Sequence, residues 1–373
     1  MIISAELNDA QLSAVTSPLR PVLVLAGAGA GKTRVVIYRI LHLIHQGIAP
    51  REILAVTFTN KAAKELKERI MHQCPQAQYD LPMVCTFHSL GVFILRRSLH
   101  LLNRENNFII YDQGDAEKLI KRCLQQHNLK QNLVDSMQYH ISQAKNRLLS
   151  PEDLDPQDYV DPVVTIYKEY QKKLEETNAL DFDDLLFLTV KLFKTCAEAR
   201  QEYQELWKAL LIDEYQDTNH AQYTMAQIIS DQHRNIFAVG APDQSIYSWR
   251  GANIHNILNF EQDYPQAQVL RLEENYRSYG NILNAANALI QNNASRLKKE
   301  LRSVRGPGEK IRLFLGKTDR EEADFVAEEI LKIHRKSQIA LRNFCIFYRT
   351  NFQSRTFEDA LLRRRIPYEI LGG

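Results

Sequence analysis

Short apolar runs that end in polar residues recur along the chain and predict the strands of a parallel β-sheet. These runs cover residues 21–25, 53–57, 83–87, 209–212, 236–240, 269–272 and 345–348. Such near-continuous apolar runs are typical of strands buried on both faces of a sheet. Helical spacing separates several of the runs, as at Val36, Ile37, Ile40, Leu41 and Ile44. The alternation predicts an α/β fold.

The pattern changes between residue 91 and about residue 205. Helical spacing dominates there, and Leu119, Ile120, Cys123 and Leu124 form one such face. We expect a helical domain at 91–204, inserted into an α/β domain at 1–90 and 205–275, with 276–373 starting a second α/β domain.

The insertion's charged residues have structural interpretations. Lys145 and Arg147 are expected on a solvated face. The acidic cluster Asp181–Asp184 is expected to cap and pack a helix.

A glycine-rich turn follows the first apolar run. Residues 26–34 read Ala-Gly-Ala-Gly-Ala-Gly-Lys-Thr-Arg and open an amphipathic helix. Strand, glycine-rich turn and Gly-Lys-Thr at a helix start make the context of a phosphate-binding P-loop. Glycine lets successive backbone N–H groups face a triphosphate, and the helix dipole favours its charge. Lys32 can reach the β- and γ-phosphates, and the Thr33 hydroxyl can bind Mg²⁺.

Two carboxylates follow the apolar run at residues 209–212. Asp213 and Glu214 should lie at the carboxyl end of a buried strand, where ligands bind in open α/β sheets. The first carboxylate can hold Mg²⁺, and the second can polarise an attacking water. Paired with the P-loop, these acids predict a site that hydrolyses a nucleoside triphosphate.

Composition adds few constraints. The 47 basic and 45 acidic residues give a net charge of +2, so a nucleic-acid surface must come from local arrangement. Five scattered cysteines without a Cys-x-x-Cys spacing indicate neither a disulfide framework nor a zinc site. These scattered cysteines predict reduced thiols in a cytoplasmic protein. No signal peptide or membrane-spanning run is evident, so no membrane partner is expected.

In this order, the motifs resemble those of the UvrD/Rep/PcrA-type DNA helicases of superfamily 1. The matching segments are 7–11, 26–34, 57–63, 86–89, 213–218, 243–252, 275–278, 348–351, 366–368 and 372–373. An alanine at the first P-loop position, here Ala26, is normal in that family. The resemblance implies that the α/β domains are RecA-like and that ATP and Mg²⁺ are the cofactors.

The resemblance also assigns roles to individual residues. The nucleotide-binding set would be Gln11, Ala26, Gly27, Ala28, Gly29, Ala30, Gly31, Lys32, Thr33, Arg34 and Tyr276. The catalytic set would be Lys32, Asp213, Glu214, Gln244 and Arg277, with Thr33 and Asp213 on the metal. Gln244 would sense the γ-phosphate, and Arg277 would reach across from the second motor domain to stabilise transition-state charge.

The implied contacts with single-stranded DNA are Phe58, Thr59, Asn60, Thr86, His88, Tyr247, Trp249 and Arg250. Aromatic stacking holds a strand without reading its sequence, which suits a motor that moves over any sequence. For Phe58, Tyr247 and Trp249 the alternative is an ordinary core aromatic, and for His88 a structural histidine.

The implied function is an ATP-driven 3′→5′ helicase or translocase acting on single-stranded DNA and duplex junctions. Alternatives are a non-enzymatic, nucleotide-gated DNA-binding protein and a subunit of a helicase–nuclease. One departure from the family is Ala241-Pro242, where an acidic residue usually follows Gly240. Family members continue past the position of Gly373, so we expect an N-terminal portion that does not unwind DNA alone.

Overall fold

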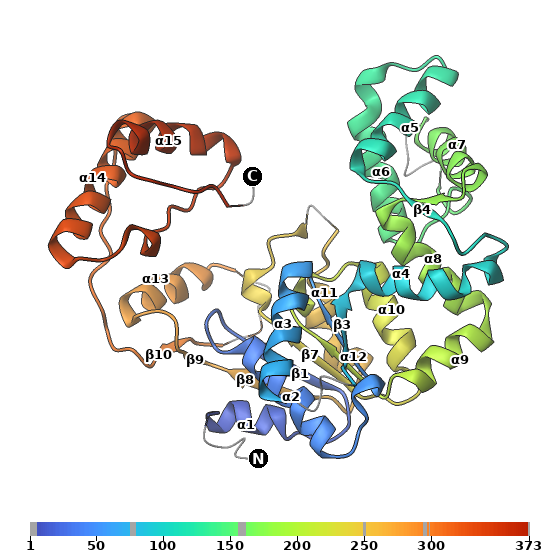
Figure 1. Ribbon diagram of the computed structural model, residues 1–373, viewed down its shortest axis with the longest axis horizontal. Helices are drawn as coiled ribbons and strands as arrows, with labels where there is room; N and C mark the ends of the chain where they lie inside the picture. The colour runs from blue at the N-terminus through green and yellow to red at the C-terminus, as the bar shows by residue number, and fades with distance from the viewer. Residues whose placement is uncertain are drawn as a thin grey trace. The chain divides into compact units, whose positions relative to one another are not determined.

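The computed structural model describes residues 6–74, 80–155, 162–248, 251–293, 297 and 299–371. The chain forms two compact units, Met1–Gly308 and Glu309–Gly373 (Figure 1).

The first unit is built on a six-stranded sheet in the order β3-β2-β6-β7-β1-β8. Every neighbouring pair of strands is parallel. The strands are β1 (Val22–Ala26), β2 (Ile53–Thr57), β3 (Met83–Thr86), β6 (Ala209–Ile212), β7 (Ile236–Gly240) and β8 (Gln268–Leu272). The predicted α/β class and parallel sheet are confirmed.

Both faces of the sheet are buried because successive strand residues enter opposite cores. In β1, Leu23 and Leu25 belong to one apolar cluster, whereas Val22 and Val24 belong to the other. The Val22–Val24 core contains side chains of α1 (Asp9–Val15), α2 (Lys32–His45) and α3 (Asn60–Gln73). The opposite core contains side chains of α4 (Phe87–Ser98), α8 (Phe182–Thr195), α9 (Ala197–Leu206), α10 (His220–Ser230), α11 (His255–Leu258) and α12 (Phe260–Asp263).

A group of helices lies between β3 and β6 in the chain. Helices α5 (Gln113–Gln126), α6 (Val134–Asn146) and α7 (Val163–Glu176) lie together in Figure 1. They share an apolar core that includes Ile120, Met137 and Ile166. Two short strands, β4 (Ile109–Ile110) and β5 (Ala179–Leu180), pair in parallel in this region. Helix α8 leads back to the sheet, since its Leu186 and Val190 belong to the sheet's core.

Lys145 is buried, so the expected solvated position for it is wrong. Its side chain is 0% exposed, and Nζ lies 2.7 Å from both Asp181 Oδ2 and Asp184 Oδ1. Asp181 caps the N-terminus of α8 in a capping box with Asp184, which confirms the capping role expected for this cluster.

The end of the first unit follows the edge strand β8 and forms a separate two-stranded sheet. After β8 come β9 (Glu274–Asn275), α13 (Gly280–Ile290) and β10 (Arg302–Ser303), and β9 and β10 pair in parallel. Leu301 packs against the P-loop, because a Cβ added to Gly27 would lie 1.9 Å from its Cδ2.

The second unit has a small helical core. Helices α14 (Asp319–Ser337) and α15 (Ser354–Arg363) bury Ala323, Ala327 and Ala360 together. The predicted strand at residues 345–348 is wrong: no strand occurs in residues 309–371, and Phe347 is 91% exposed. An apolar run forms a strand only with a partner strand, and the described part of this unit provides none.

Among the described helices, none combines the length and hydropathy that a membrane span requires.

Candidate functional site

The P-loop begins directly where β1 ends. Gly29 has φ 69° and Gly31, the N-cap of α2, has φ 84°, a region that favours glycine. A Cβ at Gly29 would lie 2.6 Å from Arg277 Cβ, and one at Gly31 would lie 2.7 Å from Gln11 Nε2. Both glycines are therefore required by backbone conformation and by close packing. Ala26 and Ala30 are buried in the core below the loop.

Gln11 supports the P-loop from α1. Its side chain is 1% exposed, and Nε2 donates to Ala30 O at 3.0 Å. It also forms a capping box with Asn8, whose Nδ2 donates to the Tyr276 hydroxyl oxygen at 2.8 Å. The N-terminal helix is thereby linked to both the loop and Tyr276.

The predicted carboxylates follow β6 as expected. Asp213 N–H donates to Val56 O at 2.9 Å, which ties this strand end to β2. Burial raises the pKa of Asp213 to about 6, and the charge of Glu214 adds to the shift. A buried carboxylate of this kind is stabilised in its charged form by a nearby cation.

Lys32 connects the P-loop to two other predicted residues. Its Nζ lies 2.7 Å from Glu214 Oε2 and donates to Gln244 Oε1 at 3.0 Å. Gln244 belongs to a 3₁₀ turn, Pro242–Gln244, that follows β7. The carboxyl ends of β1, β6 and β7 thus bring three distant parts of the sequence to one cation.

Residues 275–277 close the same site. Tyr276 N–H donates to Gly29 O at 3.0 Å, and Asn275 Nδ2 donates to Ala28 O. Asn275 Oδ1 accepts the N–H of Arg277 at 2.9 Å, which fixes the turn that carries this arginine. Arg277 therefore lies against the P-loop within the first unit.

A cavity of about 650 Å³ gathers these side chains. It is lined by Gln11, Ala28, Gly29, Gly31, Lys32, Thr33, Arg34, Thr57, Ala62, Glu65, Leu66, Arg69, Asp213, Glu214, Gln244, Tyr276 and Arg277. Five of these were not among the predicted site residues: Thr57, Ala62, Glu65, Leu66 and Arg69. Thr57 ends β2, and the other four lie on one face of α3, for which the spacing i, i+3, i+4, i+7 was a signal.

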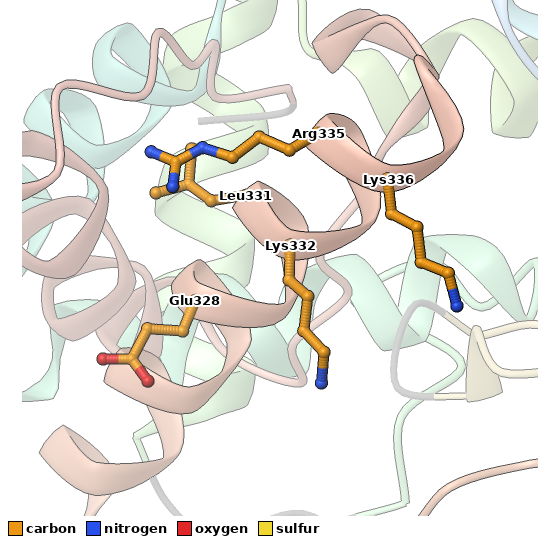
Figure 2. A pocket seen from close by; sticks show the side chains of 5 residues that line it. All are labelled: Glu328, Leu331, Lys332, Arg335 and Lys336. Carbon is orange, nitrogen blue, oxygen red and sulfur yellow. The ribbon is translucent and has the colours of Figure 1, made fainter.

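A second hollow, in the other unit, is lined by residues of a single helix. Its lining side chains, Glu328, Leu331, Lys332, Arg335 and Lys336, all come from α14 (Figure 2). A groove along one helix brings no distant groups together, and basic residues in the last turn complement the helix dipole. The cavity at the P-loop is therefore the better candidate for a reaction site.

The predicted DNA contacts that the structure describes include a stacked aromatic pair and residues at helix N-termini. Phe58 and Tyr247 stack, with ring centroids 5.2 Å apart and planes 27° apart, and both are half-buried. Asn60 is the first residue of α3. Thr59 and Thr86 are the N-caps of α3 and α4, accepting the N–H groups of Ala62 and Ser89. Trp249 and Arg250 lie outside the described residues.

His88 packs against an aromatic residue that was not predicted. Its ring meets the Phe182 ring edge-on at 6.0 Å, and burial lowers its pKa. Phe182 is 51% exposed at the first position of α8. A neutral, packed imidazole fits the structural alternative stated for His88.

Comparison with known proteins agrees with the order of these motifs. The UvrD/REP helicase N-terminal domain matches residues 7–265, and the UvrD-like helicase C-terminal domain matches residues 270–373. An ATP-dependent DNA helicase PcrA of Staphylococcus epidermidis is 43% identical over 98% of this chain and 51% of its own length. PcrA proteins of Leuconostoc citreum and Staphylococcus aureus are 42% identical over 98% of the chain, which covers 50% and 51% of their lengths. The chain therefore spans about half the length of these relatives. On these matches the chain belongs to the UvrD/REP helicase family.

Proposed function

We propose that this chain binds Mg-ATP in the P-loop cavity and hydrolyses it as part of a DNA helicase or translocase. The observation that carries the proposal is the contact of Lys32 Nζ with both Glu214 and Gln244 in that cavity. A γ-phosphate would replace Glu214 as the anion beside Lys32. The released carboxylate would then be available to accept a proton from the attacking water.

The residues present fit a bound Mg²⁺. Thr33 and Asp213, which would hold it, both line the cavity and offer the oxygen ligands that this ion prefers. Asp213 Oδ1 accepts the N–H of Glu214 at 2.9 Å, and no other bond to its carboxylate is found in the described residues. The bound ion would neutralise charge on the phosphates. Arg277, which lines the same cavity, would add positive charge near them.

We further propose that the substrate is single-stranded DNA and its duplex junctions, with 3′→5′ movement. Family membership and the stacked pair Phe58–Tyr247 support this part. The proposed domain division is a RecA-like domain at 1–90 and 205–275, an inserted helical domain at 91–204, and the start of a second RecA-like domain at 276–373. Closure between RecA-like domains on ATP binding would drive the movement.

Lys32→Ala tests the nucleotide site. Loss of a charge-assisted contact with phosphate should weaken ATP binding by roughly 10- to 100-fold, measured by calorimetry. Lys118→Ala is the matched control, because it removes the same charge from an exposed position on α5. Equal affinities of wild type and Lys32→Ala for ATP would refute the assignment. Phosphate release by the wild type separates an enzyme from a protein that is only gated by nucleotide.

Phe58→Ala tests the DNA contact. Stacking contributes about 1–3 kcal/mol per base, so binding of oligo-dT should weaken while ATP affinity stays unchanged. Phe58→Tyr keeps the ring and should bind oligo-dT like the wild type. If the alanine variant binds oligo-dT normally, Phe58 is a packing residue. Displacement of streptavidin from the 5′ end of a strand, and not from its 3′ end, would support 3′→5′ movement.

A further inference from the structure

Gln216 is a buried amide next to the proposed general base. It lies in the 3₁₀ turn Tyr215–Asp217 that follows Glu214, and it is 1% exposed. Its Nε2 donates to Glu214 Oε2 and to Asp217 Oδ2, both at 2.9 Å. One amide group thus uses both of its hydrogens on carboxylates.

The other end of the same side chain reaches a different strand. Gln216 Oε1 accepts the N–H of Ala241 at 2.8 Å, directly after β7. A Cβ on Gly240 would lie 2.9 Å from this oxygen, so glycine at the strand end permits the approach. Because the bond uses only the backbone of Ala241, it does not depend on an acidic side chain at that position. Gln216 therefore joins the Glu214 turn to the loop that carries Gln244.

The two donors to Glu214 differ in what a nucleotide would do to them. Lys32 Nζ and Gln216 Nε2 are the side-chain groups in the described residues that donate to the Glu214 carboxylate, and both use Oε2. A bound triphosphate would compete for Lys32 but cannot reach the buried Gln216. After that exchange, the amide still holds Oε2 and leaves Oε1 to accept a proton.

We propose that Gln216 is a positioning residue for ATP hydrolysis, which orients the Glu214 carboxylate once Lys32 binds phosphate and couples it to the Gln244 loop. The inference rests on the proposed function of the cavity. It predicts an effect on turnover and not on nucleotide affinity, because Gln216 itself does not line the cavity.

Two substitutions separate positioning from simple packing. Gln216→Glu keeps an acceptor for Ala241 N–H, but it places a carboxylate against Glu214 and Asp217 where the amide donors stood. Gln216→Met keeps the approximate volume and loses all three bonds. Both should lower kcat by about 10- to 100-fold, the effect of losing a hydrogen bond to a charged group, with KM for ATP close to wild type.

Gln222→Glu is the matched control. Gln222 is another buried glutamine, whose Oε1 accepts the N–H of Asn219 in the capping box of α10. This bond survives the substitution, so kcat should stay at the wild-type value. Wild-type kcat in Gln216→Glu would overturn the positioning role, because only the link to Ala241 would then matter. An increase in KM for ATP with an unchanged kcat would overturn it as well.

Hydrogen exchange of the Ala241 amide tests the bridge without turnover. The amide should be protected in the wild type and in Gln216→Glu, and should exchange faster in Gln216→Met. Equal exchange rates of the Ala241 amide in all three proteins would show that its hydrogen bond to Gln216 does not protect it. Absence of phosphate release from the wild type would instead refute the proposed function, so the two failures are distinguishable.

Discussion

At the scale of single residues, the backbone of Glu214 determines where the proposed base lies. Glu214 has φ 54° and ψ 43°, a left-handed conformation that costs a non-glycine residue about 1–2 kcal/mol. Two local bonds stabilise it: Asp213 Oδ1 accepts its N–H, and its carbonyl accepts the N–H of Asp217 at 3.0 Å. Strain that is held by neighbouring bonds is a feature of functional sites. Here it turns the chain sharply after β6, so that Asp213 and Glu214 both line the cavity.

Asp183 should make stability depend on pH. Its Oδ1 accepts a hydrogen bond from Asn146 at 3.0 Å. Burial, with the charge of Asp181, raises its pKa to about 7. The folded pKa lies above the unfolded value of about 3.9, so the folded state retains the proton. Its contribution to stability is complete below about pH 4 and is lost as the pH rises to about 7.

Asp183→Asn tests this dependence because asparagine imitates the neutral acid and keeps the Oδ1 acceptor. Between pH 5 and pH 8, the wild type should lose about 1–3 kcal/mol of unfolding free energy relative to the variant. Urea unfolding at several pH values measures the difference. If the unfolding free energies of the two proteins change in parallel with pH, Asp183 does not titrate in this range.

At the scale of elements, buried polar side chains connect the inserted helices to the sheet. Lys145 at the end of α6 pairs with Asp181, the N-cap of α8, and with Asp184 within α8. Tyr170 of α7 donates to Asp181 Oδ2 at 2.9 Å. Beside this cluster, Asn146 accepts a hydrogen bond from Asn219, the N-cap of α10. The contact reaches the sheet because α10 contributes Met225 and Ile229 to the sheet's core.

Lys145→Met should be strongly destabilising. It leaves two buried carboxylates without a cation, and breaking a buried pair in this way costs about 3–5 kcal/mol. Urea unfolding should show the loss. Adding Asp181→Asn and Asp184→Asn should recover much of it, because the buried charges are then gone and asparagine remains a good N-cap. If the triple variant is no more stable than Lys145→Met, the ionic account of this cluster is wrong.

The sequence predicted the elements whose signals are local. Apolar runs identified the strands of the large sheet, because burial on both faces leaves a continuous pattern. The same signal failed at 345–348, because strand formation also needs a partner that the run itself does not encode. The burial of Lys145 was missed for a similar reason: its carboxylate partners are distant in the sequence.

Within the candidate site, too, the residues with local sequence signals were predictable, and those that depend on contacts between distant segments were not. The P-loop and the Asp213–Glu214 pair were predictable, because a strand end and a short motif define each of them. The face of α3 and the hydrogen bonds of Gln216 were not predicted. Gln216 lies within the 213–218 motif, but its partner Ala241 N–H belongs to another strand. Which motif residues touch one another depends on strand order.

At the scale of the whole molecule, every residue that lines the cavity belongs to the unit Met1–Gly308. This includes Tyr276 and Arg277, which the proposed domain division assigns to the second RecA-like domain. Leu301, which packs at Gly27, belongs to the same unit. Tyr276, Arg277 and Leu301 therefore contribute directly to the proposed nucleotide site, whichever domain they are assigned to.

Two shortened chains test this dependence. A chain of residues 1–308 should bind Mg-ATP with nearly the affinity of the full chain, because it keeps the complete cavity lining and the cores on both faces of the sheet. A chain of residues 1–275 lacks Tyr276, Arg277 and Leu301, so its affinity should be lower by about 10-fold or more. Calorimetry with each chain measures the difference, and circular dichroism checks that both are folded. Weak binding by residues 1–308 would show that the unit Glu309–Gly373 contributes to the nucleotide site. Equal binding by residues 1–275 would show that Tyr276 and Arg277 line the cavity without contacting the nucleotide.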